Sequence, residues 1–194
     1  MAVKIEVKGL DAAVKRVSDE LKRLENGLQA EMENWGTEVA TVAKRLAPVD
    51  ENHLRGSIEA KKLPLNVSVT VGVDYAAYLE FGTRKFAASY VAGLPSDWQA
   101  FAAQYKGKST GGTFDEFVMR LVRWVHRKGI TGTYSVKTQK RTGNAVNIAN
   151  EDKSVAYMIA LKILREGIKP HPYLYPAYKQ ETPKLLDRVK NILK

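Results

Sequence analysis

Residues 74–83 read Asp74-Tyr75-Ala76-Ala77-Tyr78-Leu79-Glu80-Phe81-Gly82-Thr83. Valines occupy every second position just before this stretch, over residues 67–73, which is typical of a β-strand with one buried face. The alternation ends at Asp74, and two tyrosines and a leucine then share one face at helical spacing. We therefore predict a strand over residues 66–73 and a short helix over residues 75–80, ended by Gly82.

Strand patterns also lie before this stretch. A strand is predicted over residues 57–63, and Pro64 marks the turn that makes it the hairpin partner of the strand at 66–73. Alternation at residues 3–7 predicts a further short strand with a charged outer face. Residues 47–58 are rich in turn-forming residues and are predicted to form a loop with at most one helical turn.

A long helix is predicted over residues 11–46, with Asp11 as its N-cap and a length of about 54 Å. Two successive steps of four near Asn26-Gly27 break the heptad phase, so we expect a kink or a split there. Two interpretations of its apolar stripe stay open. Either it lies on the chain's own sheet, or its outer half packs on a neighbouring subunit. The stripe consists of Leu10, Val14, Val17, Leu21, Leu24, Leu28, Met32, Trp35, Val39, Val42 and Leu46.

The rest of the chain is predicted to be helical with long connections. Thr113 and Glu116 have the spacing of a capping box for a helix that Gly129 terminates. Three prolines predict extended structure over residues 168–177. Loops are expected over residues 84–113 and 131–147, and helices over residues 96–104, 114–127, 154–166 and 183–193.

These elements predict an α+β fold, in which a small, mostly antiparallel sheet packs against the long N-terminal helix. Additional helices come from an insert and from the C-terminus. We assign residues 1–194 to a single domain, with a basic insert that contains loops and helices over residues 84–150.

The charge of the chain favours acidic partners. The 194 residues carry a net charge of +10, from 31 basic and 21 acidic side chains. Residues 117–150 contain no Asp or Glu, and this window is either a solvated surface or a contact for nucleic acid or an acidic protein. Its candidate contact residues are Arg120, Arg123, Arg127, Lys128, Lys137, Lys140 and Arg141.

The sequence offers little for catalysis. There is no cysteine, and the three histidines, His53, His126 and His171, have no metal-ligand spacing. Glu80 is the one carboxylate set among aromatic residues, and no partner base or nucleophile is found for it. We expect no enzyme, no cofactor and no metal site, and interpret Glu80 as a buried anchor that pairs with Arg55 or Arg84. No apolar run approaches the ~20 residues of a membrane span.

Three segments together resemble a known family. The first is Ala47-Pro48-Val49-Asp50 followed by Leu54-Arg55-Gly56-Ser57-Ile58, although Glu51-Asn52 replaces the family's usual Thr-Gly. The second is Tyr75-Ala76-Ala77-Tyr78-Leu79-Glu80-Phe81-Gly82-Thr83. The third is Gly167-Ile168-Lys169-Pro170 with Pro172-Tyr173-Leu174 and Pro176-Ala177. This set is similar to the tail-completion or head–tail joining (neck) proteins of long-tailed bacteriophages. About eighty residues separate the second and third segments here, where the family often has a short link.

The resemblance implies a virion structural protein that forms a homo-oligomeric ring at the head–tail junction, after assembly in the host cytoplasm. Its partners would be other neck, connector and tail proteins, and its basic insert would face packaged DNA or an acidic neighbour. A nucleic-acid-binding protein that uses residues 117–150 is the alternative. The motif residues implied for structure and assembly are Pro48, Asp50, Leu54, Arg55, Ser57, Tyr75, Tyr78, Glu80, Phe81, Gly82, Thr83, Pro172, Tyr173, Leu174, Pro176 and Ala177.

Overall fold

The computed structural model describes residues 9–64, 66–108, 111–134, 141–142 and 144–192. Its contacts divide the chain into two compact units: Met1–Ala76 with Pro172–Lys194, and Ala77–His171. The predicted insert, residues 84–150, lies within the second unit. The strand expected at residues 3–7 lies outside the described residues.

Helix α1 (Leu10–Leu46) is the longest element of the first unit. Of the two alternatives expected at Asn26-Gly27, the split is wrong, because α1 runs through these residues as one helix. A glycine inside a helix costs only about 1 kcal/mol relative to alanine, which is too little to break a long helix. The N-cap is Gly9, with φ 92°, and Asp11 instead lies in the first turn, where its charge complements the helix dipole.

The predicted hairpin is confirmed. Strands β1 (Ile58–Leu63) and β2 (Asn66–Val71) pair antiparallel, with Ile58 opposite Val71. The short helix α2 (His53–Gly56) precedes β1 and is the single helical turn expected there. Helix α1 crosses this hairpin closely at Gly36, whose missing side chain leaves room for Val67. The predicted packing of a small sheet against the long helix, and with it the α+β class, is therefore confirmed.

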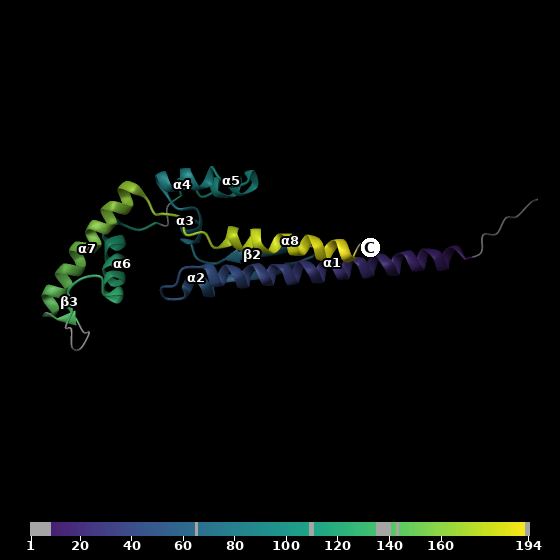
Figure 1. Cartoon of the computed structure of the whole chain (residues 1–194), viewed down its shortest axis with the longest axis horizontal. Helices are drawn as coiled ribbons and strands as arrows, with labels where there is room; N and C mark the ends of the chain where they lie inside the picture. The colour runs from purple at the N-terminus through teal and green to yellow at the C-terminus, as the bar shows by residue number, and fades with distance from the viewer. Residues whose placement is uncertain (1–8, 65, 109–110, 135–140, 143, 193–194) are drawn as a thin grey trace, which may run out of the picture. The chain divides into compact units, whose positions relative to one another are not determined.

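Helix α8 (Leu174–Ile192) lies along the C-terminal half of α1 (Figure 1). The prediction of extended structure up to residue 177 and of a helix only from residue 183 is wrong. Pro176 lies in the first turn, where no backbone donor is needed, and Pro183 is accommodated inside the helix. The hydrophobic contacts that hold α8 include buried Tyr173 and Ala177 and an edge-to-face contact of Trp35 with Tyr178, with ring centroids 6.0 Å apart.

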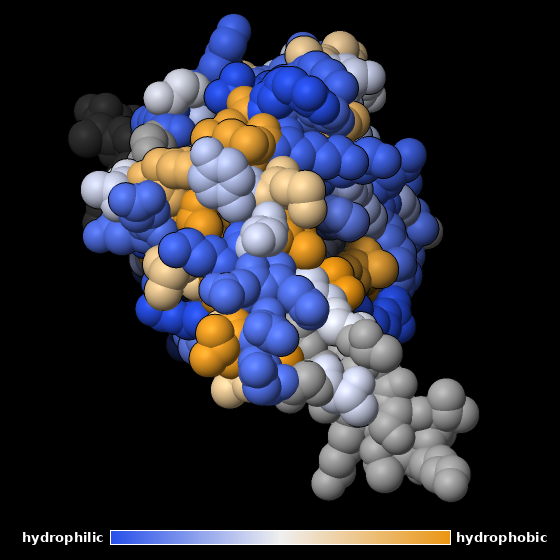
Figure 2. All heavy atoms as spheres, turned by 90° about the vertical axis from the view of Figure 1, so that its left-hand side faces the viewer, coloured by the Kyte–Doolittle hydropathy of each residue, from blue (hydrophilic) through white to orange (hydrophobic). Residues whose placement is uncertain are grey.

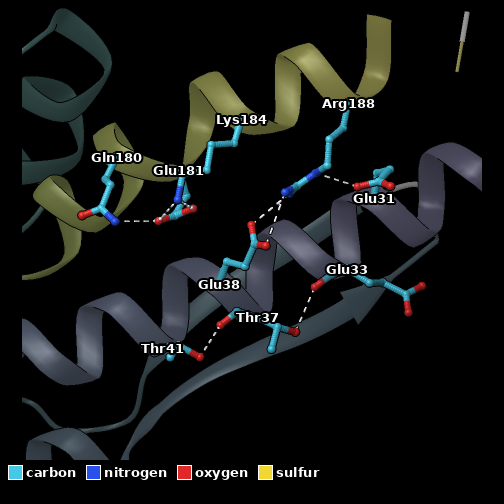
Figure 3. A network of polar contacts seen from close by, with 9 residues as sticks. All are labelled: Glu31, Glu33, Thr37, Glu38, Thr41, Gln180, Glu181, Lys184 and Arg188. Atoms are coloured by element: carbon cyan, nitrogen blue, oxygen red, sulfur yellow. Dashed lines mark hydrogen bonds and ion pairs between the residues drawn. The ribbon is translucent and has the colours of Figure 1, made fainter. Parts of the chain in front are cut away.

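Polar contacts also join the two helices (Figure 3). The guanidinium of Arg188 lies between two carboxylates of α1, with Nε 2.7 Å from Glu31 and Nη2 2.9 Å from Glu38. The hydrogen bond to Glu38 is the main cause that raises the pKa of Arg188. Two turns earlier on α8, buried Glu181 forms an ion pair with Lys184, with 2.7 Å between Nζ and Oε2. The ion pairs of Arg188 with Glu31 and Glu38 fix the register of α8 on α1, whereas the pair of Glu181 and Lys184 lies within α8.

We expect Arg188→Met to lower the free energy of unfolding of the first unit by about 1–2 kcal/mol, because it leaves Glu31 and Glu38 without their shared cation at a partly exposed site. Urea unfolding followed by the fluorescence of Trp35, in a W98F/W124F background, measures the change. Lys190→Met is the matched control, since Lys190 forms only an exposed pair with Asp187. Equal effects of the two substitutions would contradict this role of Arg188.

Among its described residues, the regular structure of the second unit consists of helices and one short ladder. The structure confirms the short helix after β2, the capping box of Thr113 and Glu116, and the left-handed stop at Gly129. Two loop predictions are wrong in part, because residues 84–91 form a helix and residues 131–147 contain an antiparallel ladder and the start of the next helix. The elements are α3 (Ala76–Phe81), α4 (Arg84–Val91), α5 (Ser96–Ala103), α6 (Phe114–Lys128), β3 (Thr133–Tyr134), β4 (Arg141–Thr142) and α7 (Ala145–Glu166).

Helices α6 and α7 pack against each other through buried Val125, Ala156 and Ala160. Asn150 and Asp152 are residue types that commonly cap helices and stand just before the helix predicted at residues 154–166, but α7 begins earlier. Asn144 caps it, and the Asn144 side chain accepts a hydrogen bond from the backbone N–H of Asn147. Asp152 instead lies buried inside α7. Its carboxylate accepts a hydrogen bond from Thr131 and lies 2.8 Å from Nδ1 of His126, so it ties the end of α6 to α7.

Candidate assembly surfaces

The first motif, residues 47–58, is a compact connection in the first unit. Arg55 donates from Nε to the carbonyl of Ala47, 3.1 Å away, and closes the loop. Leu54 and Ile58 are buried beneath it. Asn52 has φ 64°, a left-handed conformation that asparagine tolerates better than most residues, which explains how it replaces the usual glycine. Of the remaining motif residues, Pro48 and Asp50 are exposed.

The second and third motifs meet in the second unit. The Thr83 N–H donates to the carbonyl of Ile168, 2.9 Å away, and the Ile168 N–H donates to Oγ1 of Thr83, 2.7 Å away. A third bond runs from the His171 N–H to the carbonyl of Leu79, at 2.7 Å. We call this pairing of residues 79–83 with residues 167–171 the clasp. It joins two motifs that are far apart in the sequence.

The clasp depends on two glycines. Gly82 has φ 74°, and a Cβ at this position would lie 2.8 Å from the Ile168 carbonyl oxygen. Gly167 has φ 93°, and a Cβ there would collide with the backbone of Thr83. Both positions need the left-handed conformation and the small volume that only glycine supplies. The clasp therefore accounts physically for the Gly-Thr pair of one motif and the opening glycine of the other.

The side chains of α3 hold the following helices in place. Phe81 is buried and contacts the rings of Trp98 and Phe101, with centroids 6.4 and 6.0 Å away. Tyr78 donates from its hydroxyl to the carbonyl of Lys108, 2.8 Å away. The sequence alone does not identify these partners, which lie on and after α5. Tyr75 keeps 42% of its surface exposed. The pKa of its phenol is raised, mainly because part of the ring is buried and to a lesser extent because the negative charges of Asp50 and Glu51 lie nearby.

Glu80 is buried, with 2% of its surface exposed, as the anchor interpretation requires. Its predicted pairing with Arg55 or Arg84 stays a prediction. A carboxylate this deeply buried is costly unless hydrogen bonds compensate it.

We expect Glu80→Gln to destabilise the second unit by about 1–3 kcal/mol, because one carboxylate oxygen becomes an NH₂ donor where an acceptor was held. Unfolding in urea, followed by the fluorescence of Trp98 in a W35F/W124F background, measures the loss. Glu59→Gln, at an exposed position of β1, should leave stability unchanged. Normal stability of the Glu80 variant would show that the carboxylate is no anchor.

The C-terminal part of the third motif belongs to the first unit. Tyr173 and Ala177 are buried there, and Pro172, Leu174 and Pro176 are partly buried at the start of α8. Their burial favours a role in holding α8 within this unit.

The N-terminal half of α1 carries an apolar stripe that extends beyond α8. The last residue of α8, Ile192, lies beside Gly27, and α1 extends past this point to Leu10, which is nearly five turns away (Figure 1). We call Leu10, Val14, Val17 and Leu21 the outer stripe. Between 56% and 61% of the surface of each of these four residues is exposed.

Other exposed residues lie on the second unit. The space-filling view in Figure 2 shows apolar side chains interspersed among hydrophilic ones. On α6, Arg120, Arg123 and Arg127 are exposed at spacings of three and four, so they share one face, and Lys128 is exposed beside them. Arg141 lies on β4, whereas Lys137 and Lys140 lie outside the described residues. The exposed apolar residues of α7 are Val146, Tyr157, Met158, Leu161 and Leu164.

Within the described ranges, no group of three or more His, Asp or Glu residues is arranged to hold a metal ion. Among the helices of the described chain, none combines the length and apolar character needed to cross a membrane.

Comparison with known proteins gives one match. Residues 8–82 match the sequence model of a family described as "Bacteriophage HK97-gp10, putative tail-component". No curated protein and no solved structure matches the chain. The matched segment contains α1, the hairpin and the first two motifs up to Gly82. It supports a structural role in a phage particle, in contact with other tail proteins. Over residues 8–82 the chain is therefore similar to the HK97-gp10-like family of phage tail components, which confirms its resemblance to a phage tail family.

Proposed function

We propose that this chain is a neck protein of a long-tailed phage, which completes the tail or joins it to the head connector. It acts by ring-type assembly of several copies and without a catalytic step. The observation that carries the proposal is the match of residues 8–82 to a tail-component family. The three motifs also support it, because their buried residues hold each unit in its folded shape. The outer stripe, by contrast, stays exposed.

The outer stripe supports assembly on energetic grounds. The outer stripe places four large, exposed apolar residues along one helix face, whereas the exposed apolar residues of an ordinary protein surface are scattered singly. Full burial of one such side chain is worth about 1.5–3 kcal/mol. A partner that covers the stripe therefore gains substantial binding free energy, which favours a chain that works inside an assembly.

A null mutant of the encoding phage tests the proposal. Electron microscopy of its lysate should show DNA-filled heads and separate tails, or tails without a normal upper end, and a plasmid copy of the gene should restore joined particles. Normal infectious particles in the null lysate would overturn the proposal. Short or absent tail tubes would point instead to a role in the tube itself.

A second candidate function is DNA binding through α6. The exposed face of Arg120, Arg123 and Arg127 favours it, because regularly spaced guanidinium groups contact phosphates along a backbone. This function is compatible with a neck ring whose channel carries DNA.

Filter binding to duplex DNA over a salt series tests the second candidate. Replacing the three arginines by glutamine should weaken binding at low salt and reduce the salt slope by about 2–3. The matched control replaces Lys15, Lys22 and Arg23, which are exposed on α1, by glutamine. Equal losses in the two triple variants would show that any binding follows net charge alone.

A further inference from the structure

The outer stripe of α1 has acidic flanks. On a helical wheel, Glu25 and Asp11 border it on one side and Glu20 on the other. The basic residues of this helix segment come next on the wheel, with Lys22 and Lys15 beyond Asp11 and with Arg16 and Arg23 beyond Glu20, so the acidic residues are the charged groups nearest the stripe. Glu20 has an exposed partner in Arg23, 3.7 Å away, a pair weak enough to exchange for another. A partner for the stripe should therefore be apolar in its centre and basic at its rim.

These flanks disfavour the pairing of two stripes with each other. In a parallel pair, Glu20 of one copy would face Glu25 of the other across the seam. In an antiparallel pair, each acidic flank would again face the same flank of the other copy. Like charges placed opposite one another oppose association, so a coiled coil of two α1 helices is the less favourable arrangement.

The second unit contains a groove of the required character. It lies along α3, α4 and α5 and has a volume of about 730 Å³. Alanines line much of it, including Ala87, Ala88 and Ala102, so a helix can approach the backbone closely. Its ionisable rim contains Arg84, Lys106 and Lys108, and no carboxylate occurs among the described residues that line it.

The groove is held open by contacts within the unit. Tyr78 bonds to the carbonyl of Lys108 and fixes the turn after α5. Gln99 donates to the carbonyl of Leu94, 2.7 Å away, and fixes α5 to the end of α4. Arg84 directly follows the clasp and has φ 52°, a strained conformation for a non-glycine residue. The surrounding structure therefore holds the backbone of Arg84 in a conformation that its local sequence alone would not favour.

We propose that the outer stripe of one copy docks in the α3–α5 groove of a second copy. The stripe supplies valine and leucine side chains and acidic flanks, and the groove supplies an apolar floor of small residues and a basic rim. This is a helix-in-groove contact between two different surfaces of the same chain. Such a head-to-tail contact either closes into a ring or continues as a filament, which deepens the ring assembly of the proposed function.

Single-cysteine variants test the contact directly, because the chain has no cysteine of its own. Val17→Cys chains are mixed with Ala88→Cys chains under mild oxidation, and the mixed disulfide is quantified by mass spectrometry. It should exceed the Val17–Val17 product at least tenfold. Asp19→Cys, on the opposite face of α1, is the matched control and should give little product with Ala88→Cys. Equal yields for Val17 and Asp19, or a dominant Val17–Val17 product, would overturn the proposal.

A charge exchange tests the complementarity. Glu20→Lys with Glu25→Lys should reduce the mixed disulfide yield about tenfold, and Lys106→Glu with Lys108→Glu in the Ala88→Cys partner should restore it. Loss of yield without restoration would contradict the pairing of these flanks. Far-ultraviolet circular dichroism shows whether each variant keeps its helices.

The cysteine test of the contact and the null-mutant test of the proposed function can fail independently of each other. The cysteine experiment uses only purified chains and reports the contact between copies, whereas the null lysate reports the role in the particle. If the cysteines fail to pair while the null phage lacks joined particles, the chain is a neck protein whose outer stripe binds another protein.

Discussion

Gly82→Ala is expected to destabilise the second unit by about 2–4 kcal/mol. Two costs add. Alanine at φ 74° pays roughly 1–2 kcal/mol for the left-handed conformation. Its Cβ would also lie 2.8 Å from the carbonyl oxygen of Ile168 and 3.0 Å from the nitrogen of Pro170, both of which are backbone atoms of the clasp. Urea unfolding followed by the fluorescence of Trp98, in a W35F/W124F background, measures the loss.

Gly107→Ala separates these costs. Gly107 has nearly the same φ, 77°, but a Cβ there would meet nothing within 4 Å. It should therefore lose only the conformational part, roughly 1–2 kcal/mol. The difference between the two losses of stability measures the cost of placing a Cβ between residues 79–83 and residues 167–171. If both lose the same amount, the clasp does not depend on the volume of Gly82.

Gly36→Ala is expected to destabilise the first unit by about 1–3 kcal/mol, although alanine is the better helix former. Gly36 is buried where α1 crosses the hairpin, and a Cβ there would collide with Cγ1 of Val67. Unfolding followed by the fluorescence of Trp35, in a W98F/W124F background, measures the loss. Val67→Ala in the Gly36→Ala chain removes the colliding methyls and should cost less than it does in the wild-type chain.

Gly27→Ala, on the same helix, is expected to change the free energy of unfolding in the opposite direction. A Cβ at Gly27 would lie 3.6 Å from the Ile192 side chain, which is ordinary packing distance. We expect it to stabilise the first unit by about 0.5–1 kcal/mol through helix propensity. Stabilisation by both substitutions would show that α1 does not need the close approach at Gly36.

Much of the first unit could be predicted from local patterns. The valine alternation before Asp74 and the turn at Pro64 specify the hairpin, and the repeat of apolar residues specifies α1. The capping box at Thr113 and Glu116 likewise fixes the start of α6 through neighbouring residues. These features depend on residues close in the sequence, which is why the sequence alone predicts them.

The errors fall where distant contacts decide the structure. Pro183 reads as a helix start, but the packing of α8 on α1 holds a longer helix around it. Residues 84–91 lack a clear apolar period, yet they form α4, which begins directly after Thr83, the residue that the clasp bonds to Ile168. Asp152 has the appearance of a cap, and only the fold brings His126 and Thr131 to it.

In the candidate assembly surfaces, too, the sequence predicts local features and misses contacts between distant segments. The sequence singles out Gly82-Thr83 and Gly167-Ile168 as motif residues, but it does not show that they bond to each other across more than eighty residues. Glu80, first noticed as a carboxylate among aromatics, proves to be buried beside Phe81, which packs on α5. The α3–α5 groove carries no sequence signal, because many of its lining residues are alanines and Arg84 is more than twenty residues from Lys106 and Lys108.

The most direct test of the account locates the chain in the phage particle. Purified particles of the encoding phage are labelled with gold-conjugated antibodies against the chain and viewed by electron microscopy. The proposed function predicts label at the junction between head and tail, in particles that contain several copies of the chain by quantitative mass spectrometry. Label along the tail tube or at the distal tip, or particles that lack the chain, would contradict it.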